Sequence, residues 1–128
     1  MSLVIALLAQ VALPVTLPTV AVTAADATCG GREPLARIAT CMSTTQSGLE
    51  TVMAAYEADF GRQGWNATDG GGARVVYVRR RETGGCDAFQ LMAIVGEAAP
   101  EVDTPVILAL ATVPGDACAA APISADPQ

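Results

Sequence analysis

The chain contains no histidine and no lysine, and all seven of its basic residues are arginine. Histidine is the most common general base and the most common metal ligand, so its absence removes both. It also excludes a Ser-His-Asp triad and a Cys-His pair. The sequence therefore predicts a protein that is not an enzyme and that binds no metal and no cofactor.

Charge is missing from the first 25 residues, and all 13 acidic residues lie from Asp26 onward. The formal net charge is −6. An acidic balance disfavours nucleic-acid binding, which needs a basic surface, and also disfavours adhesion to anionic lipid. The use of arginine alone, together with many alanines, indicates a bacterial source with a GC-rich genome.

The uncharged segment has the features of a secretory signal. Leu3–Leu13 is an apolar run of the length of a signal h-region, and it is too short for a bilayer span of roughly 20 residues. Pro14 and Pro18 interrupt any helix that continues through it. Small residues permit cleavage after Ala25 or after Ala27. We therefore predict a periplasmic or secreted protein that has no membrane contact after cleavage.

The signal lacks a basic n-region, so either the true start lies upstream or the signal is a weak one. An uncleaved N-terminal anchor is the alternative. The predicted organisation is a signal peptide over residues 1–25, a single domain over 28–118 and a flexible tail over 119–128.

The four cysteines all follow the signal, and an even number in an exported chain predicts two disulfides. No pair has the close spacing that is typical of a zinc site. If the last two strands form a hairpin, Cys86 and Cys118 meet at its open end. The favoured pairing is therefore Cys86–Cys118 with Cys29–Cys41, and the other two connectivities stay open.

Apolar periodicity predicts two helices at the start of the domain. Leu35, Ile38 and Met42 lie on one face of a helix over Pro34–Met42. A second helix is predicted over Gly48–Arg62. It begins with the capping box Ser47-x-x-Glu50, it has Tyr56 and Phe60 on its buried face, and Gly61 and Gly64 mark its end.

Four strands are predicted after the helices, and they are separated by glycine-rich turns or a polar loop: Trp65–Thr68, Arg74–Arg81, Ala88–Val95 and Val106–Val113. Strands joined by short turns run antiparallel. The predicted fold class is α+β, with two N-terminal helices packed on one face of a four-stranded antiparallel meander sheet and with two disulfides.

The candidate binding residues are Arg74, Arg79, Arg81 and Trp65. Arginine recognises carboxylates and phosphates through two parallel hydrogen bonds, so a cluster on one strand is a candidate anion site. The alternative is that these charges protect an exposed strand edge from aggregation. Trp65 either anchors a binding face or packs over the end of the helix as part of the core.

These features predict a non-catalytic binding module, whose partner is an envelope or extracellular protein, a glycan or a small ligand. One alternative is a secreted inhibitor of a basic hydrolase, because an acidic domain complements a basic enzyme. A second alternative is an enzyme that uses only carboxylates, tyrosine or arginine. Two acidic side chains that converge in a pocket would be its signature.

Overall fold

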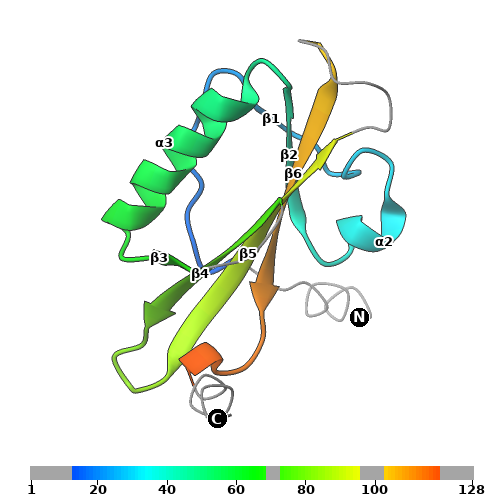
Figure 1. Cartoon of the computed structure of the whole chain (residues 1–128). Helices are drawn as coiled ribbons and strands as arrows, with labels where there is room; N and C mark the ends of the chain where they lie inside the picture. The colour runs from blue at the N-terminus through cyan, green and yellow to red at the C-terminus, as the bar shows by residue number, and fades with distance from the viewer. Residues whose placement is uncertain (1–12, 69–72, 96–102, 119–128) are drawn as a thin grey trace, which may run out of the picture.

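The computed structural model describes residues 13–68, 73–95 and 103–118 and has one antiparallel sheet (Figure 1). The sheet has six strands in the order β1-β2-β6-β5-β4-β3. Two short helices, α2 and α3, accompany it. The elements in chain order are β1 (Ala24–Ala25), α2 (Glu33–Ala36), β2 (Thr40–Thr45), α3 (Leu49–Arg62), β3 (Asn66–Thr68), β4 (Arg74–Arg80), β5 (Cys86–Val95) and β6 (Pro105–Val113).

The predicted α+β fold, with two N-terminal helices on a four-stranded meander, is wrong. The first helix ends at Ala36, and Ile38 is 66% exposed and not on a buried helix face. The chain then enters β2, which pairs with β6 from Thr40 opposite Leu110 to Thr45 opposite Pro105. Pairing with a central strand outweighs a weak helical pattern that covers only about two and a half turns. The protein is therefore mostly β.

Several parts of the prediction are confirmed. The four predicted strands are present as β3, β4, β5 and β6, and the second helix is present as α3. The favoured disulfides, Cys29–Cys41 and Cys86–Cys118, are both formed. The predicted tail over 119–128 lies outside the described residues. Within the part of the chain that the structure describes, neither helix has the length and apolarity that a membrane crossing requires.

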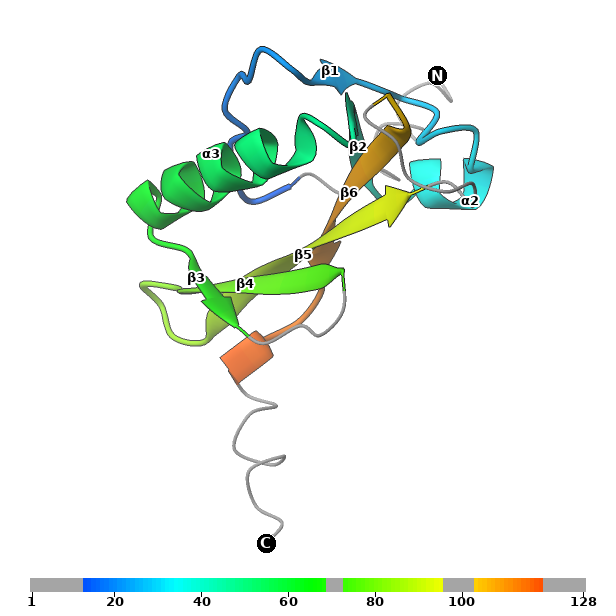
Figure 2. The ribbon, with the colours of Figure 1, turned by 45° about the horizontal axis from the view of Figure 1, so that its top comes forward.

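α3 lies across one face of the sheet and carries the centre of the core (Figure 2). Its fully buried side chains are Val52, Tyr56 and Phe60, spaced four residues apart on one helical face. The Phe60 ring lies 5.0 Å from the Tyr77 ring and 5.2 Å from the Phe89 ring, both in edge-to-face contact. The expectation that Tyr56 and Phe60 belong to the core is confirmed.

The two ends of α3 differ in how well the sequence predicted them. The capping box does not form, because the helix begins after Gly48 and no side chain caps its start. At the other end, Gly64 adopts a φ of +92° and its N–H bonds to the carbonyl of Gly61. The Trp65 N–H donates to the Phe60 carbonyl at 3.0 Å. This pair of bonds is a Schellman motif, for which the left-handed position favours glycine.

The opposite face of the sheet is covered in part by the loop that carries α2. Cys29, Cys41, Ile107 and Ala109 form a second buried cluster there, with Leu35 and neighbouring apolar side chains packed against it. Because β6 contributes to both clusters, it is buried on its two faces.

The two buried tyrosines make the stability of the fold depend on pH in the alkaline range. Burial raises the pKa of the Tyr56 hydroxyl, and burial together with the nearby Glu57 charge raises the pKa of Tyr77. The unfolded chain therefore loses these protons near pH 10 while the folded chain keeps them. The unfolded state then binds fewer protons, so stability is full below about pH 10 and falls as the pH rises further.

No other side chain titrates in this range, because the chain has no lysine and its four cysteines are in disulfides. We expect the free energy of unfolding in urea to fall above about pH 10, with a limit of about 1.4 kcal/mol per pH unit for each tyrosine. Tyr56→Phe should lower this slope. It should not destabilise at pH 7, because the buried Tyr56 hydroxyl has no hydrogen-bond partner among the described residues. An unchanged slope in the variant would contradict the assignment.

Candidate functional site

Two of the predicted arginines, Arg79 and Arg81, border a hollow at the end of the sheet where β4 turns into β5. The hollow has a volume of about 580 Å³. We call it the arginine hollow and define it by its lining residues, which are Arg79, Arg80, Arg81, Glu82, Thr83 and Asp87. Three positive and two negative side chains therefore line a depression on a protein whose net charge is −6.

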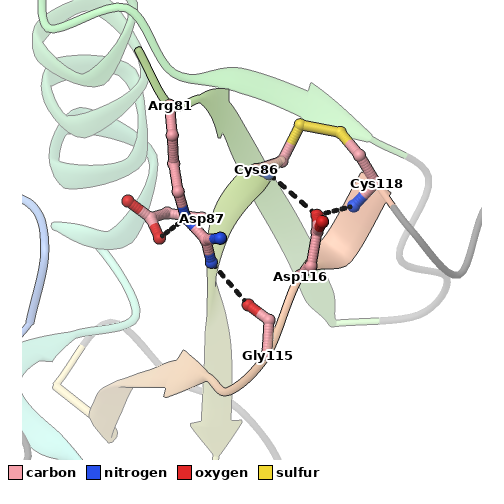
Figure 3. A network of polar contacts seen from close by, with 6 residues as sticks. All are labelled: Arg81, Cys86, Asp87, Gly115, Asp116 and Cys118. Atoms are coloured by element: carbon pink, nitrogen blue, oxygen red, sulfur yellow. Dashed lines mark hydrogen bonds and ion pairs between the residues drawn. A yellow bond between two sulfur atoms is a disulfide. The ribbon is translucent and has the colours of Figure 1, made fainter. Parts of the chain in front are cut away.

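Arg81 is fixed by two hydrogen bonds of 2.7 Å (Figure 3). Its Nε donates to Oδ1 of Asp87, and its Nη2 donates to the carbonyl of Gly115 in the chain that leaves β6. The hydrogen bond to Asp87 is the main cause that raises the pKa of this guanidinium above its already high value. Arg81 therefore ties the β4–β5 turn to the segment after β6, and much of its charge is already balanced.

Asp116 connects the same turn to the second disulfide. Its Oδ1 accepts the backbone N–H of Cys86 at 2.8 Å and that of Cys118 at 3.0 Å, as Figure 3 shows. One carboxylate oxygen thus holds both half-cystines of the Cys86–Cys118 bridge. Sequence reasoning missed Asp116 and Asp87. The available signal was an aspartate two residues before a cysteine, the spacing at which an Asx turn returns to its own backbone.

Arg79 and Trp65 contact each other. The Arg79 guanidinium carbon lies 4.4 Å from the centroid of the Trp65 ring, and its Nη1 donates to the Gln63 carbonyl at 3.1 Å. Trp65 is only 3% exposed, and its ring packs against Phe89. Its proposed role as a binding anchor stays a prediction, and the structure places Trp65 in the core beneath Arg79.

The other two arginines of β4 lie on the opposite face of the strand from Arg79. Arg74 is outside the arginine hollow, and its Nη1 lies 3.4 Å from Oε1 of Gln90. Arg80 lines the hollow and is exposed, and its side chain makes no hydrogen bond or ion pair with any described residue. The structure thus brings Arg79 and Arg81 together with Arg80, which the sequence prediction left out, and leaves Arg74 apart.

The arginine hollow offers hydrogen-bond donors from its three guanidinium groups. Residues 13–68, 73–95 and 103–118 contain no cluster of three or more His, Cys, Asp or Glu side chains that would hold a metal ion. All five aromatic residues of the chain are buried: Tyr56, Phe60, Trp65, Tyr77 and Phe89. An exposed aromatic ring for stacking on a ligand is therefore absent from the whole chain.

No protein-family model matches this chain, and no curated protein or solved structure matches it either.

Substitution of Asp116 tests whether its hydrogen bonds to Cys86 and Cys118 stabilise the protein. We expect Asp116→Ala to lower the free energy of unfolding in urea by about 1–2 kcal/mol, because two partly buried N–H groups lose a charged acceptor. Asp103→Ala removes the same charge from an exposed position and serves as the control. Equal stabilities of the two variants would show that the Asp116 contacts contribute nothing to stability.

Proposed function

We propose that this chain is a non-catalytic binding module of the periplasm or the exterior, and that it binds an anionic group of its ligand at the arginine hollow. One observation carries the proposal: three consecutive arginines border a single hollow, and Arg80 has no partner within the described residues. An exposed, unpartnered guanidinium beside a hollow is available to a carboxylate or phosphate without breaking an existing contact.

The neighbouring arginines support binding by being fixed in place. A guanidinium has five N–H donors. The hydrogen bonds within the described residues use one donor of Arg79 and two of Arg81. These bonds already restrain both arginine side chains, so the arginines lose little further side-chain entropy when a ligand engages their remaining donors.

The compartment is argued from the disulfides. The structure contains two disulfides and no free cysteine, a state that persists in oxidising compartments and is rare in the cytosol. No thiol remains for nucleophilic or redox chemistry. These features support a binding role outside the cytoplasm.

The buried aromatic residues narrow the class of ligand. With every aromatic ring inside the core, the protein has no exposed π-face to lie against a sugar. An acidic segment of an envelope or extracellular protein, or a small molecule with a carboxylate or phosphate, suits the arginine hollow better than a neutral glycan does.

The test compares two arginines of the same strand. Arg80→Ser removes the unpartnered charge from the hollow, whereas Arg74→Ser removes a charge from the same face of β4 outside it. Inorganic phosphate and a short glutamate-rich peptide are titrated into each protein at about 0.15 M ionic strength, where the Debye length is about 8 Å, and binding is followed by backbone amide chemical shifts. We expect Arg80→Ser to weaken binding by about tenfold or more, since a charged hydrogen bond contributes about 1.5–3 kcal/mol.

Arg74→Ser should change the affinity by less than about twofold. Arg74 lies six residues along β4 from Arg80, so its exposed charge is largely screened from a ligand in the arginine hollow. An equal loss in both variants would indicate a general charge effect and no site. Failure of the unsubstituted protein to bind either probe would also reject the proposal. Arg79 and Arg81 are poorer test positions, because each makes structural contacts whose loss would change the fold around the hollow.

A further inference from the structure

The segment Leu13–Ala25, which we call the strap, packs onto the domain although it precedes both predicted cleavage sites. It follows α3 before turning into β1 (Figures 1 and 2). Val15 is only 7% exposed and belongs to the main core cluster. Leu13, Leu17 and Val20 are partly buried against the same cluster. These apolar side chains are thus part of the core that α3 and the sheet share.

Gln63, at the end of α3, binds the strap through both atoms of its amide. Its Oε1 accepts the N–H of Thr16 at 3.1 Å, and its Nε2 donates to the carbonyl of Thr16 at 2.8 Å. The same Nε2 lies 2.7 Å from Oδ2 of Asp59, which fixes the amide in this orientation. A side chain here satisfies both backbone groups of one strap residue, as a neighbouring strand would.

Further along, the strap satisfies a buried polar group of β2. Thr44 is 6% exposed, and its Oγ1 donates to the carbonyl of Val22 at 2.8 Å. The start of α3 also fits closely against this point. A Cβ on Gly48 would lie 2.8 Å from Thr44 Oγ1 and 3.3 Å from Cγ2 of Val22, so the helix start and the strap are packed against each other.

The last residues of the strap form the edge strand of the sheet. Ala24 pairs with Ser43 and Ala25 pairs with Met42 as β1 on β2. The pairing continues beyond the strap, because the N–H of Asp26 donates to the Cys41 carbonyl at 2.9 Å. Cleavage after Ala25 or Ala27 would therefore remove an edge strand and a buried core residue together.

We propose that the strap is a permanent part of the folded domain, and that the sites after Ala25 and Ala27 are not used for processing. Any removal of an export signal then cuts before Leu13. Pro14 and Pro18, which interrupt the signal-like run, restrict the backbone φ and disfavour a helix in the strap, and the structure has no helix over residues 13–25.

The first experiment examines the exported protein itself. The full chain is expressed in a bacterial host with an oxidising periplasm, and the purified product is analysed by N-terminal sequencing and by intact mass without reduction. We expect a chain that begins at or before Leu13 and carries both disulfides. A folded product with both disulfides that begins at Asp26 or Thr28 would overturn the proposal.

A second experiment tests the packing in the full chain. Val15→Asp places a charge in the core, whereas Thr19→Asp places the same charge at an exposed position four residues further along the strap. We expect Val15→Asp to lower the urea midpoint and Thr19→Asp to leave it unchanged. Equal midpoints would show that the strap does not pack as described.

Hydrogen exchange keeps the test decisive if Val15→Asp does not fold. In the unsubstituted chain the Thr16 amide should exchange at least about tenfold more slowly than an unprotected amide, because it is bonded to Gln63. In Gln63→Ala this protection should be lost while that of β5 persists. Unprotected exchange at Thr16 in the unsubstituted chain would reject the proposal.

Discussion

Five consecutive side chains of β6, from Val106 to Leu110, are buried, so both faces of this strand must be covered. Successive side chains of a strand point to opposite faces. On one face, Val106, Leu108 and Leu110 join the core beneath α3. On the other, Ile107 and Ala109 pack in the cluster that the Cys29–Cys41 disulfide closes. The position of α3, the loop with α2 and the first disulfide all follow from the need to remove β6 from water.

The same burial explains where prediction from the sequence fails. A short, continuous apolar run is typical of a strand that is covered on both faces. The buried backbone N–H and C=O groups of such a strand need hydrogen-bond partners at both edges. A meander of four strands leaves the last one at an edge, with one side unpaired. The missing neighbour is β2, whose residues Thr40–Thr45 show little apolar alternation. Its partner is far away in the chain, so no local pattern reveals the pairing, whereas the local helix and hairpin signals of α3, β4 and β5 were sufficient.

For the arginine hollow, too, the sequence predicted only part of what the structure shows. Alternation along β4 predicts which face each arginine occupies, but it does not predict the partners that the face offers. Arg79 lies over Trp65, and Arg81 is bonded to Asp87 and Gly115, which come from other parts of the chain. The two residues that looked most available are thus the two whose side chains already make contacts within the fold. Arg80 became a candidate only when the structure showed it without a partner beside the hollow.

Gln63 joins the strap to the arginine hollow, so the two are parts of one arrangement. Its side-chain amide holds Thr16, while its backbone carbonyl accepts the hydrogen bond from Arg79. The Schellman motif fixes this residue at the end of α3, and Gly64 brings the chain round so that Trp65 lies beneath Arg79. A chain without the strap would lose both hydrogen bonds between the Gln63 amide and Thr16 and would keep the bond to Asp59, at the same residue whose carbonyl holds Arg79. Retention of the strap therefore affects the residue that holds Arg79 at the arginine hollow as well as the stability of the core.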